Sequence, residues 1–446
     1  MPMERVTNLP DNRLEKNFSE AKPLYTESEA RIEANRCIYC YDAPCTTACP
    51  AGIDIPGFIR KIASGNIRGA AKTIFEVNLL GVSTAQVCPV EELCAGACVY
   101  NKDNVPPINI GRLQRFATEK GLLWEQDKKS TLFSPQNQTD RKVALIGAGP
   151  ASLACAGHLT LAGVKSIIYE KDDLPGGLNV TGIAPYKLFT DAALEEIEWL
   201  KQFGFEIQTG LEVGRDISID HLLENFDAVF LGAGLGRDKL PGIPGEDAAG
   251  VWGATELIKK IKNDRAFKLP ANLESVNVVG GGNSAIDIAR ELALLGVPEV
   301  NIVYRRTISE MPGYRHELAA ARQEGVRMFE RAVPVEIIAN DRLVLCTKHK
   351  LTGEPQQFES DWIVLAIGNE RDAGQLSPGL EIDEKGCVVV DPDTMKTSVA
   401  KIYAGGDCIN GGKEVVNAVA DGRDAAWSML REWGIGEAQQ VRRNHG

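Results

Sequence analysis

Short apolar runs, separated by helix-compatible stretches, recur through the last two thirds of the chain. The runs occupy residues 143–146, 228–233, 276–279, 300–304, 362–367 and 402–407. Runs of this length bounded by glycine are typical of strands buried on both faces of a parallel sheet. Helical stretches between such strands complete βαβ units, so the pattern predicts an α/β fold.

The first βαβ unit, residues 142–173, carries a dinucleotide-binding pattern. Its first strand leads into the turn Gly147, Ala148, Gly149, Pro150, Ala151 and Ser152, and its second strand ends at Glu170. Gly147 permits a tight turn, and Gly149 lets backbone amides approach a pyrophosphate at the helix N-terminus. A carboxylate at Glu170 can bind ribose hydroxyls. A membrane helix over residues 143–164 is the alternative, which the glycines and Pro150 disfavour.

A second unit, residues 276–304, repeats the pattern with a different ending. Its turn is Gly280, Gly281, Gly282, Asn283 and Ser284, and its second strand ends in Arg305 and Arg306. An acid there would accept from a free ribose 2′-hydroxyl, whereas arginines suit a 2′-phosphate. The ending therefore predicts a preference for NADPH over NADH. The alternative is an exposed basic strand end with no ligand.

The order of the strands predicts that one nucleotide-binding domain is inserted into the other. The strand at 362–367 closes the second unit, and the strand at 402–407 returns the chain to the first. The predicted first domain therefore consists of residues 140–234 and 369–446, and the second of residues 235–368.

Two further segments are predicted to lie at the first nucleotide site. Gly176 and Gly177, in the loop after the second strand, let the backbone lie close to a bound cofactor. Asp407, at the end of the last strand, can accept hydrogen bonds from ribityl or ribose hydroxyls.

Seven of the eleven cysteines lie in two groups. Their spacing is Cys37-x2-Cys40-x4-Cys45-x3-Cys49-Pro50 and Cys88-Pro89-x4-Cys94-x3-Cys98. Such runs are typical of iron–sulfur ligation, in which the last cysteine can serve a second cluster. Structural zinc is the alternative. Seven thiolates are one short of two four-ligand clusters, so we expect Gln114 to supply the eighth ligand, with Glu119 a weaker candidate.

The cysteine groups fall in a predicted helical domain, residues 1–139. Thr26 and Glu29 form a capping-box pattern, and residues 55–66 and 67–78 predict two amphipathic helices. The first 25 residues are predicted to form a loose arm. The polar residues 126–141 are predicted to form a linker.

Composition narrows the class of protein. The 446 residues carry a net charge of −12, which argues against nucleic acid as the main partner. We find no signal peptide and no other membrane span, so the eleven cysteines indicate a reducing compartment, the cytoplasm. No redox cysteine pair lies near either nucleotide site, and no Ser–His–Asp arrangement is present. We therefore expect the cofactors, with no catalytic side chain, to carry the chemistry.

The chain resembles the flavin-containing reductase half of the dihydropyrimidine dehydrogenase family, which is closely related to the small subunit of glutamate synthase. The motifs that carry the resemblance are CIYCYDAPCTTACP, VCPVEELCAGAC, IGRLQRF, GAGPAS, GGL, GGGNSAIDIAR and YAGGD. The resemblance implies two [4Fe–4S] clusters, FAD in the first nucleotide domain and NAD(P)H in the second.

Matching the motif positions implies specific contacts. One cluster would be held by Cys37, Cys40, Cys45 and Cys98, and the other by Cys49, Cys88, Cys94 and Gln114. FAD would contact Gly147, Ala148, Gly149, Pro150, Ala151, Ser152, Glu170, Lys171, Gly176, Gly177, Leu178 and Asp407. NAD(P)H would contact Gly281, Gly282, Asn283, Ser284, Arg305, Arg306, Ala366, Ile367 and Gly368. Lys187 stands where the family commonly has an arginine, so its flavin contact is left open.

The resemblance also implies a partner protein. The chain has a nucleotide input and clusters but no site for a pyrimidine, so we expect an FMN- and iron–sulfur-containing subunit that reduces uracil or thymine. The alternative partner is the large subunit of glutamate synthase, whose small subunits typically carry an acid where this chain has Gln114. A non-catalytic scaffold is a third interpretation, which the intact glycines and cysteines disfavour.

Overall fold

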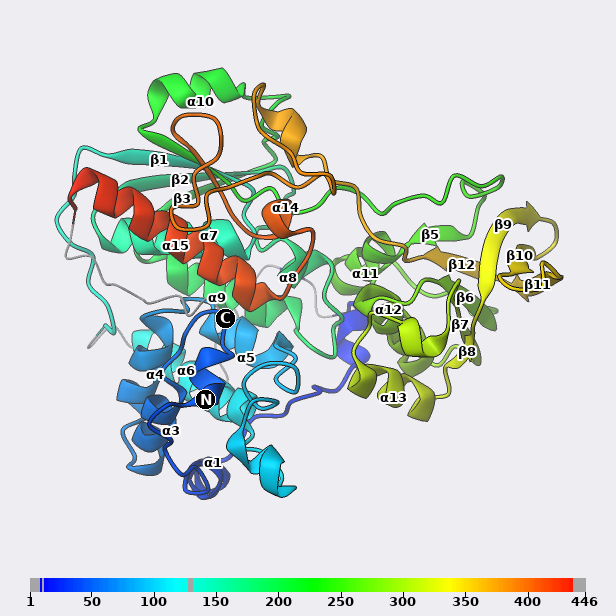
Figure 1. Ribbon diagram of the computed structural model, residues 1–446, viewed down its shortest axis with the longest axis horizontal. Helices are drawn as coiled ribbons and strands as arrows, with labels where there is room; N and C mark the ends of the chain where they lie inside the picture. The colour runs from blue at the N-terminus through cyan, green and yellow to red at the C-terminus, as the bar shows by residue number, and fades with distance from the viewer. Residues whose placement is uncertain (1–8, 10–11, 127–130, 436–446) are drawn as a thin grey trace.

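The computed structural model describes residues 9, 12–126 and 131–435 (Figure 1). Helices that precede residue 127 form one body, and two parallel sheets with helices packed on them form two others. The body whose sheet contains β1 (Lys142–Ile146) lies beside the helical body, and the one whose sheet contains β6 (Ser275–Val279) lies towards the opposite end of the molecule. The predicted α/β class, with two Rossmann-like units after a helical domain, is confirmed.

The helical body is built from short helices with one apolar face each. Its elements, with η for 3₁₀ helices, are η1 Leu14–Asn17, α1 Glu27–Ala34, α2 Pro44–Thr47, α3 Ile55–Ala63, α4 Ile67–Phe75, α5 Gly81–Val87, η2 Val99–Asp103 and α6 Ile110–Gln126. Helix α1 begins with the predicted capping box, in which Glu29 accepts from the Thr26 N–H at 2.8 Å. Helices α3 and α4 bury Phe58, Ile62 and Ile74 in one core with α6.

The first Rossmann unit has a five-stranded parallel sheet in the order β13-β4-β1-β2-β3. Its strands are β1, β2 Lys165–Glu170, β3 Glu206–Thr209, β4 Ala228–Leu231 and β13 Ile402–Ala404. Its helices are α7 Pro150–Leu161, α8 Leu178–Thr181, α9 Thr190–Lys201, α10 Ile219–Asn225, α14 Asp407–Asn410 and α15 Val415–Trp433. Strand β13 pairs with β4 in the register Ile402–Val229, so the last strand among the described residues joins the first sheet.

The second Rossmann unit lies between these strands in sequence. Its parallel sheet has the order β5-β12-β6-β7-β8. The strands are β5 Val251–Gly253, β6, β7 Glu299–Val303, β8 Arg327–Phe329 and β12 Trp362–Leu365. The helices are α11 Ala254–Asn263, α12 Asn283–Leu294 and α13 Arg315–Gln323, with η3 at Ile308–Glu310 and η4 at Ala373–Leu376 near the return to the first unit.

An antiparallel sheet that the sequence pattern did not predict projects from the second unit. Its strands are β9 Ala332–Ala339, β10 Leu343–His349 and β11 Pro355–Ser360, in the order β11-β10-β9. The chain enters it at Arg331, whose φ of +58° is in the left-handed region. Figure 1 shows this sheet at the end of the molecule farthest from the helical body.

The arm that precedes α1 is packed against the rest of the protein. Arg13 and Glu15 are buried and paired at 2.8 Å, and Phe18 packs in the core of the second Rossmann unit. The backbone N–H of Thr190 donates to the Glu15 carboxylate. The expectation of a loose arm is therefore wrong for residues 12–25, because buried ion pairs hold polar side chains there. The part of that prediction on residues 1–8, 10 and 11 lies outside the described residues.

The long apolar stretch at 143–164 forms strand β1 and helix α7 separated by a turn. In the described part of the chain, no helix combines the length and the hydrophobicity that a membrane span requires.

Candidate functional site

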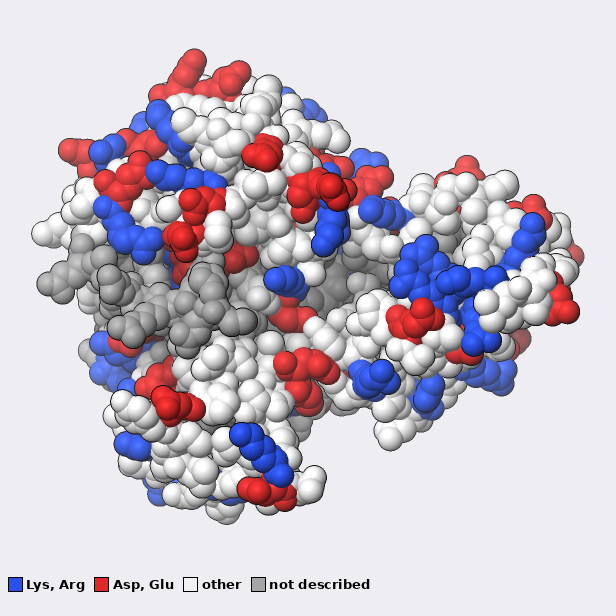
Figure 2. Space-filling view, in the orientation of Figure 1, with Lys and Arg blue, Asp and Glu red and all other residues white. Residues whose placement is uncertain are grey.

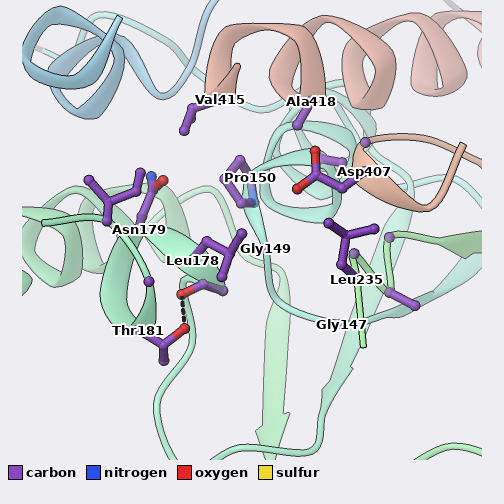
Figure 3. A pocket seen from close by; sticks show the side chains of 18 of the residues that line it. Gly147, Gly149, Pro150, Leu178, Asn179, Thr181, Leu235, Asp407, Val415 and Ala418 are labelled. Atoms are coloured by element: carbon purple, nitrogen blue, oxygen red, sulfur yellow. Dashed lines mark hydrogen bonds between the residues drawn. The ribbon is translucent and has the colours of Figure 1, made fainter. Parts of the chain in front are cut away.

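A cavity of about 460 Å³ lies where the two Rossmann units and the helical body meet. Its lining includes residues of the first glycine-rich turn, the last two residues of the second, and two residues at and just after the end of α5: Gly147, Gly149, Pro150, Asn283, Ser284, Val87 and Pro89. Figure 3 shows Pro150, Leu178, Asp407 and Val415 around this space, which we call the nucleotide cavity. Its size suits a cofactor-sized ligand.

The first turn brings Glu170 to the edge of the nucleotide cavity. Gly147 has a φ of +83°, and a Cβ there would lie 2.7 Å from the carbonyl oxygen of Gly232. This tight turn aims the N–H of Ala148 at the Glu170 carboxylate, at 2.6 Å. The N–H of Asp172 donates to the other carboxylate oxygen at 2.9 Å. Burial raises the pKa of Glu170, and the two donors fix its orientation.

The loop after β2 passes directly over the first turn. Gly177 has a φ of +54°, and a Cβ there would lie 2.9 Å from the Cα of Gly149. The N–H of Gly176 donates to the Ala148 carbonyl at 2.9 Å. Leu178 follows and lines the cavity. Only glycine permits this approach of two backbones, which is why the loop at Gly176 and Gly177 can lie against the first turn.

Asp407 lies at the start of α14 with its carboxylate in the nucleotide cavity (Figure 3). Burial raises its pKa, and one oxygen accepts from the Lys413 N–H at 3.2 Å. Lys171, which follows β2 at the same edge of the sheet, also lines the cavity. The cavity thus presents the polar groups that hydroxyls and phosphates of a dinucleotide require.

Ser152 lies behind the lining. It is fully buried, and a Cβ on Gly232 would lie 2.1 Å from its Oγ, so it packs α7 against the end of β4. Ala151, by contrast, lines the cavity. The small residue in the third glycine position therefore serves helix–strand packing.

The second turn is built in the same way. A Cβ on Gly281 would lie 2.6 Å from the ring of Tyr304, and Gly282 precedes α12 with open space beside it. Asn283 accepts from the Tyr314 N–H at 3.0 Å. Beside this turn, strand β12 ends at Leu365 and is followed by Ala366, Ile367 and Gly368, of which Gly368 has a φ of +108°.

Lys187 joins the two Rossmann units at the wall of the nucleotide cavity. Its ammonium lies 2.7 Å from Asp287 on α12 and 2.6 Å from Glu317 on α13. Burial alone would lower the pKa of Lys187, but the two carboxylates outweigh burial and raise it. The sequence did not predict this pairing, since the partners are 100 or more residues away.

The structure brings more basic residues to the end of β7 than the sequence indicated. Arg305 and Arg306 are exposed, and the N–H of Arg331 donates to the Arg306 carbonyl at 2.9 Å. The N–H of Lys350 in turn donates to the Arg331 carbonyl at 2.7 Å. The antiparallel sheet therefore adds two basic residues that sequence reasoning missed. Figure 2 shows lysines and arginines gathered on the second Rossmann unit.

The seven clustered cysteines line two separate cavities in the helical body. Cys37, Cys40, Cys45 and Cys98 line one, which we call the first cysteine cavity. Cys49, Cys88, Cys94 and Gln114 line the other, the second cysteine cavity. All seven thiols are free. Each cavity thus has four side chains that can supply sulfur or oxygen ligands, and this donor set fits a [4Fe–4S] cluster.

The side-chain carbonyl oxygen of Gln114 is the atom available to ligate a metal centre. Its Nε2 donates to the Gly81 carbonyl at 2.9 Å and to Thr84 Oγ1 at 3.0 Å, which fixes the amide. Glu119, the weaker candidate, pairs instead with Arg115 at 2.5 Å.

Burial raises the pKa of Cys45 to about 11 and that of Cys94 to about 12. These thiols are therefore neutral at pH 7 unless a metal centre stabilises their thiolates.

The three cavities adjoin through shared segments. Val87 and Pro89 line the nucleotide cavity, while Cys88 between them lines the second cysteine cavity. Likewise, Val415 lines the nucleotide cavity and its neighbour Val416 lines the second cysteine cavity. The side chain of Ile55 lines both cysteine cavities. The second cysteine cavity therefore lies between the nucleotide cavity and the first cysteine cavity.

Two family models match the chain. Residues 14–125 match the model of dihydropyrimidine dehydrogenase domain II with its 4Fe–4S cluster. Residues 141–422 match the pyridine nucleotide-disulphide oxidoreductase model. The first match spans both cysteine cavities, and the second spans both parallel sheets.

Curated relatives are similar to almost the whole chain. A glutamate synthase [NADPH] small chain of Halomonas elongata is 34% identical over 93% of this chain and 93% of its own length. The NAD-dependent dihydropyrimidine dehydrogenase subunit PreT of Salmonella typhimurium is 35% identical over 92% of this chain and 96% of its own length. The putative oxidoreductase AegA of Escherichia coli is 33% identical, with 94% and 68% covered.

Solved structures share the fold of the two Rossmann units. Thioredoxin reductase of T. acidophilum has a TM-score of 0.55 at 22% identity and covers 66% of this chain and 99% of its own. FprA of Mycobacterium tuberculosis in complex with NADPH has a TM-score of 0.53 at 20% identity, with 66% and 85% covered. The chain is therefore an NAD(P)H-dependent flavin oxidoreductase with a 4Fe–4S domain, and it belongs to the pyridine nucleotide-disulphide oxidoreductase family, in the group that includes PreT and the glutamate synthase small chains.

Proposed function

We propose that this chain is the electron-input subunit of a two-subunit dihydropyrimidine dehydrogenase. It oxidises NAD(P)H, with NADPH favoured, and passes electrons to an FMN- and iron–sulfur-containing partner that reduces uracil or thymine. When bound, FAD accepts a hydride from NAD(P)H, and the clusters carry single electrons. The proposed compartment is the cytoplasm, where eleven free cysteines stay reduced.

The proposed site residues are those that the motifs imply. Cys37, Cys40, Cys45 and Cys98 hold one cluster, and Cys49, Cys88, Cys94 and Gln114 hold the other. The first turn, Glu170, the loop at Gly176 and Gly177, and Asp407 hold FAD. The second turn, Arg305, Arg306 and the end of β12 hold NAD(P)H. Lys187 positions the two units at the cavity that both cofactors would share.

One observation carries the proposal, namely that Cys88 lies between two residues of the nucleotide cavity wall. A cluster bound by Cys88 would then be separated from a flavin in that cavity only by the backbone around Cys88. The loop of the first cysteine cavity reaches the surface, where Ile38 is 60% exposed and Tyr41 is 100% exposed. We infer that electrons leave for the partner on this side.

A glutamate synthase small subunit is the second candidate, and a relative of each kind is similar to the chain at 34–35% identity. The neutral amide at Gln114, in place of an acid, favours the pyrimidine branch. Reconstitution with an FMN subunit from the same host tests the choice. NAD(P)H-dependent reduction of uracil or thymine that needs both chains is the expected result. Oxidation of NADPH driven by glutamine and 2-oxoglutarate, with a large glutamate synthase subunit, would support the second candidate instead.

A further inference from the structure

The N-terminal arm reaches from the Rossmann units to the second cysteine cavity. The N–H of Ala21 donates to the Tyr186 carbonyl at 2.8 Å, next to Lys187. One residue later, the guanidinium of Arg115 donates to the Lys22 carbonyl at 2.5 Å. The backbone at Lys22 is therefore held from both sides.

The side chain of Lys22 ends beside the second cysteine cavity. Its Nζ donates to the carbonyl of Cys88 at 2.6 Å. It would lie 3.9 Å from a Cβ on Gly111, which lines the same cavity. In the described part of the chain, no carboxylate forms an ion pair with this ammonium within 4.0 Å.

Other cations near the cysteine cavities are balanced or screened. Arg423, whose guanidinium donates to the Ala51 carbonyl at 2.5 Å two residues from Cys49, is paired with Asp424 at 2.9 Å. Arg36 is paired with Glu33 at 2.8 Å, and Arg60 is exposed. Burial lowers the pKa of Lys22. A lysine side chain held at the Cys88 carbonyl without a close counter-ion thus distinguishes the second cysteine cavity.

We propose that Lys22 is a positioning residue that raises the reduction potential of the cluster held by Cys49, Cys88, Cys94 and Gln114. Reduction of a cluster adds one negative charge, and a cation held beside it favours the reduced form. The neutral Gln114 acts in the same direction, since it replaces a fourth thiolate. Lys22 and Gln114 together make this cluster easier to reduce than the cluster of the first cysteine cavity. It is also the cluster nearer to the nucleotide cavity. This inference rests on the proposed function.

The test is an anaerobic redox titration of the intact holoprotein, monitored by EPR. Lys22→Met should shift the midpoint potential of the second-cavity cluster to a lower value, while Lys22→Arg keeps it near the wild-type value. The signal of that cluster is the one altered in Gln114→Ala. The potentials of the other cluster and of FAD should move less. Iron and flavin contents show that the cofactors are retained.

Glu91 provides a variant with the opposite expected sign. Its exposed carboxylate lies 3.8 Å from His316 Nε2 and beyond ion-pair distance from Lys22, on which its charge still acts. Glu91→Gln should therefore raise the same potential, and it tests the account even if Lys22→Met does not fold. Unchanged second-cavity potentials in both variants with full iron content, or equal shifts of all three centres, would overturn the role of Lys22 and leave the proposed function intact. Iron for only one cluster in the wild-type protein would overturn both.

Discussion

The ammonium of Lys187 lies 2.7 Å from the carboxylate of Asp287, so an ion pair joins the two Rossmann units at the wall of the nucleotide cavity. A second link lies nearby, where the hydroxyl of Tyr314 donates to Glu414. Both links fix the second unit so that its residues Asn283 and Ser284 line the same cavity as the first turn.

Replacement of Lys187 should therefore affect both stability and coenzyme use. Lys187→Ala leaves Asp287 and Glu317, which are 10% and 9% exposed, without their cation. Removal of one member of a buried pair costs about 3–5 kcal/mol of unfolding free energy. We expect a lower Tm and a higher KM for NADPH with an artificial acceptor. Lys187→Arg, which keeps the charge, is the control. Wild-type Tm and KM in the alanine variant would show that the pair is dispensable.

Stability should also depend on pH through Glu196, which joins α9 to α5. Its carboxylate accepts from the N–H groups of Val82 and Ser83 at 2.7 and 3.0 Å. Burial raises its pKa from 4.5 to about 7. The pKa of Glu196 is higher in the folded than in the unfolded state, so the protonated carboxyl favours folding. This contribution to the free energy of unfolding is fully present below pH 4.5 and is lost as the pH rises through 7. The loss amounts to about 3.5 kcal/mol at ~1.4 kcal/mol per pKa unit.

Denaturant unfolding of wild type and Glu196→Gln over this pH range measures the effect. The wild-type protein should lose stability relative to the variant as pH rises towards 7. Parallel pH profiles of the two proteins would rule out Glu196 as the titrating group.

Local patterns predicted much of the fold. The two βαβ units and the cysteine spacing depend on residues close in sequence, and strands and helices form where these patterns predicted them. The arm at Arg13 and the pairing of Lys187 could not be predicted, because each depends on packing between distant segments. The residues at Arg331 and Lys350 were missed for the same reason, since an antiparallel sheet brings them to the end of β7.

Coenzyme preference should depend on the basic end of β7. Each charge-assisted hydrogen bond to a phosphate contributes about 1.5–3 kcal/mol at best, so loss of Arg305 and Arg306 should lower kcat/KM for NADPH about tenfold or more. The value for NADH should change little. Steady-state assays with an artificial acceptor measure both. Arg327→Ala, on the neighbouring strand β8 and paired with Glu299 at 3.3 Å, is the matched control. Equal losses for both coenzymes would contradict recognition of a 2′-phosphate.

The proposed ligand role of Gln114 predicts a selective change in one cluster. Gln114→Ala should retain FAD but lose or alter the EPR signal of the second-cavity cluster. Glu119→Gln, on the same helix but paired with Arg115, should leave both cluster signals unchanged. Should Glu119→Gln change the signal while Gln114→Ala does not, the weaker candidate is the ligand.

The central claim is that electrons enter at the nucleotide cavity and leave through the first cysteine cavity. It is tested most directly with Cys40→Ser in the complex reconstituted with the FMN subunit. Stopped-flow absorbance should show NADPH bleaching the flavin of this variant as in wild type, while NADPH-dependent reduction of uracil is lost. Wild-type uracil reduction by the Cys40→Ser complex, with its first-cavity cluster absent by iron analysis and EPR, would contradict the account.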